Sequence, residues 1–399
     1  MLSFNLVFAQ SNSLDYYINQ AIISSPVLVD LQNQNESLML DSMLVYAGIK
    51  PQANFSSSNY YAPVIGGVGY DAIITNVGSF NALAGVTYDV FGKSAAKNSL
   101  QGYSIQQKLN DVNFKLTVRD LKQTVTEQYL TVWSEQQQLK NSATQLTILS
   151  NEMNALKTLT QGGVFNEADY LSFVVNLNQE QLNYQQEKIS VKKELYVLNY
   201  LCGIADTIYA SLADPVITLS PVKTTSLEGE NFFLDSLQLQ NKMDQIKFDY
   251  KPKLTVQADA GYNTTFQYHA EKNFGESFGL NFSVPLFKGN QYNLQLQQIS
   301  LDEKSRVEYK KQFNNKLAIQ KMQLQQQIAD NNQLSAATQN QLQMLQTLLA
   351  SNNQLLQSGD IGIADYFLTY TNFQNCKAAL LQLQANKLLL ISQLNFLNY

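Results

Sequence analysis

The stretch Gly163-Val-Phe-Asn-Glu-Ala-Asp-Tyr170 has a counterpart in Gly359-Asp-Ile-Gly-Ile-Ala-Asp-Tyr366, 196 residues later. Glycine, alanine, aspartate and tyrosine recur at matching places, and the same offset carries Phe91 onto Phe287. Between residues 91 and 201 the offset needs no insertion or deletion. A solenoid repeat has only about 20–50 residues. The sequence therefore predicts a duplicated structural half, whose two copies do equivalent jobs side by side.

Composition excludes several functional classes. Only 15% of the 399 residues are charged, and the net charge of −5 gives no basic surface for nucleic acid. His269 is the single histidine, which argues against histidine-based catalysis and multi-histidine metal sites. Cys202 and Cys376 fit no metal motif, and we expect both to be unpaired. We predict no enzymatic activity, no cofactor and no metal.

Helical segments account for most of the chain. Residues 94–161 and 289–357 contain no proline, and each helix would span about 100 Å at 1.5 Å per residue. Further helices are predicted at 167–201 and 364–398, and one precedes the first strand of each half. The spacing of Leu146, Leu149, Met153 and Leu156 is typical of a coiled-coil seam, and Leu342, Leu345 and Leu349 repeat it.

Four segments alternate with period two and are predicted strands: about 51–61, 79–91, 253–266 and 276–287. Residues 62–78 between the first two read as a glycine-rich loop. The first repeat then covers 11–202, an irregular connector covers 203–230, and the second repeat covers 231–399. Residues 1–10 resemble the end of a secretory signal, because they are apolar and close on the small residue Ala9. We expect one intertwined domain overall.

The predicted strands have one apolar and one polar face, which suits a tilted outer-membrane barrel. A sheet packed on helices is the alternative, but the helices are too polar to cover a broad apolar face. Four strands cannot close a barrel, and an open edge cannot lie in lipid. Several chains would therefore each donate four strands.

Six short motifs, in order along the duplicated frame, resemble the TolC family of outer-membrane efflux factors. Ser25-Pro26-Val27-Leu28 resembles the start of the family's first long helix. Lys50-Pro51-Gln52 and Lys251-Pro252-Lys253 resemble its helix-to-strand corners, and Val284-Pro285-Leu286-Phe287-Lys288-Gly289 its strand-to-helix corner. Gly163–Asp169 and Gly359–Asp365 resemble the turns that join paired helices.

The resemblance implies a mainly α-helical fold with a β-barrel part. Three chains would form one 12-stranded barrel in lipid of the cell outer membrane and a helical barrel, made of antiparallel coiled-coil helices, in the periplasm. Such a passive duct would work with a periplasmic adaptor and an inner-membrane pump, and would export drugs, metals or secreted proteins, as in type I secretion.

By resemblance, the two helix turns would lie at the periplasmic entrance. Entrance and selectivity residues would be Asp169, Asp365, Asp360 and Glu167. Residues for adaptor docking would be Gly162, Gly163, Val164, Phe165, Gly359, Ile361 and Gly362. Ile361 replaces the family's arginine latch and Leu368 an acidic residue, so we expect a gate closed by packing of Tyr170, Tyr366 and Phe367.

Two other functions compete with the export duct. A surface-anchored coiled-coil stalk could use the long helices without any transport, and an intracellular scaffold could use them without a membrane. Neither needs two amphipathic hairpins. Asp169 and Asp365 could also serve only their helix dipoles, worth about 0.3–1 kcal/mol each.

Overall fold

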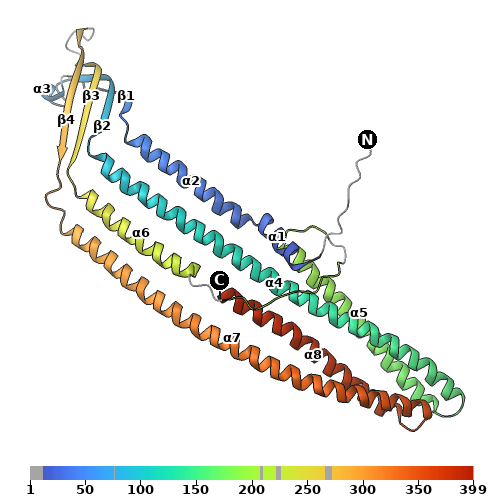
Figure 1. Cartoon of the computed structure of the whole chain (residues 1–399). Coiled ribbons are helices and arrows are strands. Elements are labelled where there is room, and N and C mark those ends of the chain that lie inside the picture. Colours follow the sequence, from blue (N-terminus) through green and yellow to red (C-terminus); the bar gives the residue numbers. More distant parts are fainter. Residues whose placement is uncertain (1–11, 76, 207–209, 222–225, 266–271, 399) are drawn as a thin grey trace, which may run out of the picture. The chain divides into compact units, whose positions relative to one another are not determined.

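The computed structural model describes residues 12–75, 77–206, 210–221, 226–265 and 272–398. Within these residues, long helices dominate and four strands form a single sheet (Figure 1). The chain divides into two compact units. The first comprises residues 1–29, 114–227 and 312–399, and the second comprises 30–113 and 228–311. Each unit draws on both repeats, so neither unit coincides with one repeat.

The described residues form eight helices and four strands, and both halves end in the same order of strand, long helix and helix. In chain order they are α1 (Leu14–Ser24), α2 (Pro26–Gly48), β1 (Gln52–Tyr61), α3 (Ala72–Thr75), β2 (Gly78–Asp89), α4 (Gly92–Gln161), α5 (Glu167–Leu201), α6 (Leu227–Asp249), β3 (Lys253–Thr265), β4 (Phe274–Ser283), α7 (Gln291–Ser358) and α8 (Ile363–Leu397). No helix among the described residues is long and apolar enough to cross a membrane.

The sheet lies in the second unit, and its strands run in the order β1-β2-β3-β4 with every neighbour antiparallel. The central pair joins the two repeats, since Val86 of β2 lies opposite Ala258 of β3. Within the part of the chain that the structure describes, the outer strands β1 and β4 each have a partner on one side only. The sheet therefore ends in two open edges, whose backbone groups have no ladder partner.

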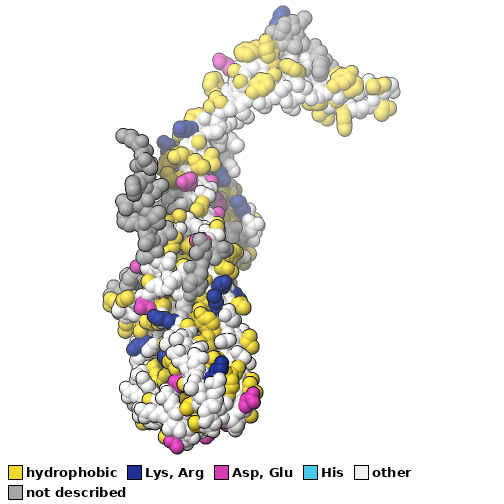
Figure 2. Space-filling model, turned by 90° about the vertical axis from the view of Figure 1, so that its right-hand side faces the viewer, with side chains coloured by type: hydrophobic (Ala, Val, Ile, Leu, Met, Phe, Trp, Pro, Cys, Tyr) yellow, Lys and Arg dark blue, Asp and Glu magenta, His cyan; other side chains and the backbone are white. Residues whose placement is uncertain are grey.

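The two faces of the sheet differ in polarity, as the alternation predicts. Residues opposite one another in the register share a face. On one face lie Phe55, Phe80, Val86, Val256, Tyr262, Phe278, Leu280 and Phe282. The other face carries Asn54, Ser56, Asn81, Thr87, Gln257, Asp259, Ser277 and Asn281. The apolar face is open, for Phe278 is 81% and Leu280 75% exposed (Figure 2).

Two hydrophobic clusters hold the helices of the first unit. The first joins α1, α4, α5 and the connector around Tyr17, Tyr129 and Leu198, which are at most 2% exposed. The second joins α4, α5, α7 and α8 near their turns. Leu149 and Leu156 of the predicted seam are buried there, and Leu349 of the second half packs against them. The predicted coiled-coil seam is thus part of this second cluster. Both cysteines are free.

Several boundaries differ from the prediction. The segment 62–78 is not all loop, because α3 forms a short turn there and β2 begins at Gly78. Strand β2 ends two residues early at Asp89, whose side chain accepts a hydrogen bond from Phe91 N (3.0 Å) and so starts the turn into α4. Strand β4 ends at Ser283, just before Pro285, which has no N–H for a ladder. Helix α6 begins at Leu227, four residues earlier than expected. Residues 1–10, the predicted signal remnant, lie outside the described residues.

Candidate functional site: the paired helix turns

The turn between α4 and α5 is built on a left-handed glycine. Gly163 has φ +80°, a conformation that costs other residues energy because of Cβ. Val164 N donates to Leu159 O at 2.9 Å, which closes the end of α4. Asn166 then caps α5, since its side chain accepts from Asp169 N at 2.8 Å. The turn is therefore fixed by local hydrogen bonds at both of its ends.

The turn between α7 and α8 repeats this geometry at the 196-residue offset. Gly359 has φ +83°, and Asp360 N donates to Leu355 O at 2.8 Å. The second cap differs, because Gly362 has no side chain to accept a hydrogen bond. Asp360 instead accepts a bond from Ser358 Oγ at 2.6 Å. Equivalent backbone turns thus carry different surface chemistry.

The structure brings the two turns into contact within one chain, as Figure 1 shows for the ends of α4 and α7. A Cβ built on Gly359 would lie 2.5 Å from Val164 Cγ1. Phe165 of the first turn and Ile361 of the second pack against the same hydrophobic cluster. The two predicted docking turns therefore form one surface.

The three predicted gate aromatics all pack against the hydrophobic core of this chain, but they are buried to different extents. Tyr366 is 2% exposed and stacks on Phe173 with ring centroids 6.4 Å apart, while Phe367 meets Phe173 edge-on at 4.8 Å. Burial raises the pKa of the Tyr366 and Tyr370 phenols, so both stay neutral. Tyr170 packs on the cluster while partly exposed. Tyr366 is thus already packed inside one chain, and a gate between chains stays a prediction.

The four predicted entrance carboxylates surround the turns at the surface. Glu167, Asp360 and Asp365 are exposed, and Asp169 is half-buried. Asp169 and Asp365 both stand in the first turn of their helices. Among the described residues, the carboxylates of Asp169 and Asp365 have no hydrogen-bond or ion-pair partner. Their positions suit both the helix-dipole role and a role toward ions.

Sequence reasoning missed a buried polar pair beside the turns. Asn352 Nδ2 donates to Thr369 Oγ1 at 2.8 Å, and the two residues are 9% and 8% exposed. The equivalent residues of the first repeat are Leu156 and Phe173, which are buried and apolar. The offset alone shows this exchange, since it aligns an amide with a leucine at a seam position.

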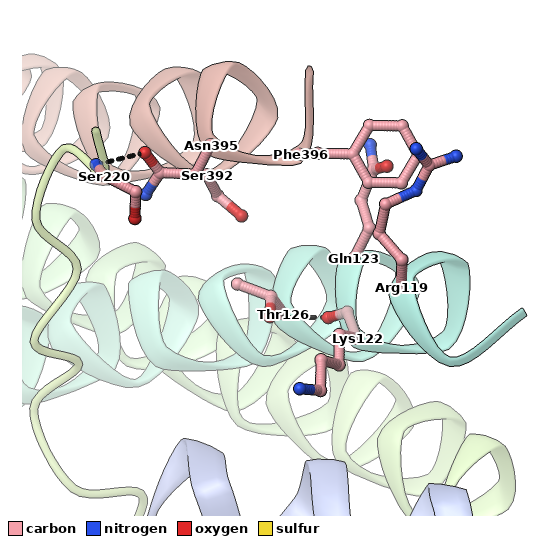
Figure 3. A pocket seen from close by; sticks show the side chains of 8 residues that line it. All are labelled: Arg119, Lys122, Gln123, Thr126, Ser220, Ser392, Asn395 and Phe396. Atoms are coloured by element: carbon pink, nitrogen blue, oxygen red, sulfur yellow. Dashed lines mark hydrogen bonds between the residues drawn. The ribbon is translucent and has the colours of Figure 1, made fainter. Parts of the chain in front are cut away.

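A cavity of about 130 Å³ lies where the connector crosses α4 and α8 (Figure 3). Arg119 lies over the ring of Phe396, 4.2 Å from its centroid. Asn395 accepts from Ser220 N at 2.7 Å and donates to Thr218 O at 2.7 Å. Lys122 extends away from Phe396, on the other side of α4. These contacts hold the connector against α4 and α8. We therefore interpret the residues around this cavity as structural rather than as a binding site.

Comparison with known proteins places the fold. No protein-family model and no curated protein matches this chain. Its fold is that of bacterial outer-membrane channels, as three solved structures show. They are the channel-forming protein CusC (14% identity, 97% of this chain and 92% of that chain, TM-score 0.76), the outer membrane protein VceC of Vibrio cholerae (13%, 96% and 96%, 0.76) and the open-state outer membrane channel MtrE of Neisseria gonorrhoeae (12%, 96% and 88%, 0.73). The expected likeness to TolC-like channels is confirmed for the fold.

Proposed function

We propose that this chain is one subunit of a trimeric outer-membrane channel that exports substrates passively. The observation that carries the proposal is an exposed apolar sheet face bounded by two open edges. Lipid favours such a face but does not tolerate unpaired edges. Strand β1 of one copy pairs with β4 of the next, which removes both edges. Four strands are below the smallest bacterial barrel of about eight, and three copies supply twelve.

The helices supply the periplasmic part of the duct, and their sequence is rich in glutamine, asparagine and serine. Charged side chains are sparse on the face drawn in Figure 2. Such walls attract neither sign of ion strongly. A periplasmic adaptor grips the paired turns, and an inner-membrane pump selects the substrate. The chain carries out no catalysis, and no group of three or more potential metal ligands exists among the described residues. A stalk without transport would leave the amphipathic sheet unexplained.

Cross-linking of the sheet edges tests the assembly. Ser56→Cys on β1 and Asn281→Cys on β4 are combined in a chain whose own cysteines are replaced by alanine. A flexible bis-maleimide applied to outer membranes should give covalent dimers and trimers. Each single-cysteine chain should remain a monomer on the denaturing gel. A doubly substituted chain that yields only monomers, or a chain absent from outer membranes, would contradict the proposal.

Asp365 is proposed to form a ring of three carboxylates at the entrance of this channel. Such rings favour cations. Asp365→Asn should lower the cation preference measured as a reversal potential in a planar bilayer, while Glu308→Asn on exposed α7 should not. An unchanged preference in the Asp365 variant would remove the ring from the proposal.

A further inference from the structure

Two adjoining cavities lie among α4, α5 and α8 of the first unit. The first has a volume of about 250 Å³ and the second of about 200 Å³, and they share Gln138. Their walls contain four glutamates, Glu127 and Glu135 in the first and Glu180 and Glu187 in the second. Of the described residues, no lysine or arginine lines either cavity. The pair therefore forms a trough with an acidic lining, although Lys193 outside the lining acts on Glu135 and Gln123 Nε2 donates to Glu127 Oε1 at 2.9 Å.

Several buried polar atoms in this trough have no hydrogen-bond partner among the residues that the structure describes. Ser134, 7% exposed, lines the first cavity, and its Oγ makes no hydrogen bond. The same holds for Glu135 Oε2, Glu187 Oε2, Asn141 Oδ1 and Gln374 Nε2. Folded proteins leave few such groups unsatisfied. A bound molecule that donates hydrogen bonds would satisfy most of them.

The two carboxylate oxygens of Glu135 have different surroundings. Its Oε1 accepts from Ser190 Oγ at 3.2 Å, which ties α4 to α5. Its Oε2 is left buried without a donor. Burial raises the pKa of this carboxyl, whereas the hydrogen bond from Ser190 and the charge of Lys193 act in the opposite direction.

The lining defines the chemistry of the missing partner. Three of the five unpartnered atoms are oxygens that only accept, and two of these belong to glutamate carboxylates, so a cationic hydrogen-bond donor fits them. Gln374 Nε2 only donates and is not satisfied by such a partner. Leu130, Ala385 and Leu389 supply apolar wall between the glutamates, so the partner also has hydrocarbon segments. The donor set does not suit a metal ion, because no three potential ligands cluster among the described residues and Mg²⁺ or Ca²⁺ needs about six oxygens.

We propose that this trough binds linear alkyl polyamines, with ammonium groups at the glutamates and methylene chains along the leucines. Glu127 and Glu135 lie eight residues apart on α4, about 12 Å, and Glu180 and Glu187 lie seven apart on α5, about 10 Å. Flexible amines can bridge such separations. The inference deepens the proposed function, on which it rests for its meaning in transport, by naming cationic amines as a cargo class.

Calorimetric titration of the purified full-length protein with spermidine tests the site. Binding should weaken as salt rises, because the contacts are ionic. Glu135→Gln and Glu187→Gln should each weaken binding about tenfold, which corresponds to the loss of one charge contact. Ser134→Ala should weaken binding about threefold, and this variant tests the site if a glutamate variant fails to fold. Glu308→Gln, exposed on α7 and outside both cavities, should bind as the parent does.

Three results would overturn the inference: no heat of binding, equal binding by the Glu135 and Glu308 variants, or displacement of spermidine by an equal concentration of Mg²⁺. The first two show that the trough is not the site, and the third shows charge screening alone. If the channel conducts but binds no amine, this inference is wrong and the proposed function stands. If the protein binds amine but its sheet edges never cross-link, the proposed function is wrong and the amine site stands.

Discussion

Gly163 and Gly359 occupy the same left-handed position in their turns, yet their surroundings differ. A Cβ on Gly163 would meet nothing within 4 Å, whereas one on Gly359 would meet Val164 at 2.5 Å. Alanine at either place suffers backbone strain of about 1–2 kcal/mol. Alanine at 359 must also displace the other turn.

Gly359→Ala should therefore lower the free energy of unfolding by more than Gly163→Ala does, by about 1–3 kcal/mol from overpacking. Urea unfolding of the two variants measures the difference. Adding Val164→Ala to Gly359→Ala should recover most of the excess, because it removes the methyl group that is struck. Equal losses in the two glycine variants would show that the turns do not press on each other.

At the scale of the elements, the two helix hairpins differ in their seam. The α4–α5 hairpin uses Leu156 and Phe173 where α7–α8 uses Asn352 and Thr369. Thr369 Oγ1 also donates to Asp365 O at 3.1 Å, so its hydroxyl both gives and accepts. A satisfied pair of this kind contributes little net stability, but one left without its partner is costly.

Thr369→Val should cost about 1–3 kcal/mol, because the amide of Asn352 stays buried without an acceptor. Combining it with Asn352→Leu should restore part of that loss, so the two changes are not additive. Chemical denaturation of the single and double variants gives the coupling. If the double variant loses more unfolding free energy than the two single variants lose together, the pair contributes more than the mutual satisfaction of its two polar groups.

The sequence predicted most elements because each long helix and each strand of the first half has a copy in the second half. Boundaries failed where local chemistry decides them, as at Asp89, which turns the chain before the expected strand end. The turn glycines were predictable because left-handed backbone favours glycine. The contact between Gly359 and Val164 was not, since it depends on how two distant hairpins pack.

At the scale of the whole molecule, the apolar sheet face predicts where the assembled channel tolerates a charged side chain. Leu280 and Asn281 are neighbours on β4 that point to opposite faces. A lysine on the lipid side of a barrel costs about 2–4 kcal/mol near the bilayer midplane, whereas the lumen side tolerates it. Leu280→Lys should reduce the amount of heat-resistant oligomer in outer membranes, and Asn281→Lys should not.

Gel mobility of unheated samples measures this oligomer, and total chain abundance is the control for expression. Equal oligomer in both variants would argue that the apolar face does not lie in lipid.

The central pairing of the sheet also sets the order in which the molecule can form. Residue Phe80 of β2 lies opposite Thr264 of β3, from the other half of the chain. Contacts so far apart in sequence form slowly, because a long loop must close before they stabilise anything. The β1–β2 hairpin can form early, but its second edge waits for residues made much later. During that interval the first hairpin offers an apolar face and a free strand edge to any other chain, so the duplication that gives the fold its symmetry also gives its nascent form an aggregation hazard.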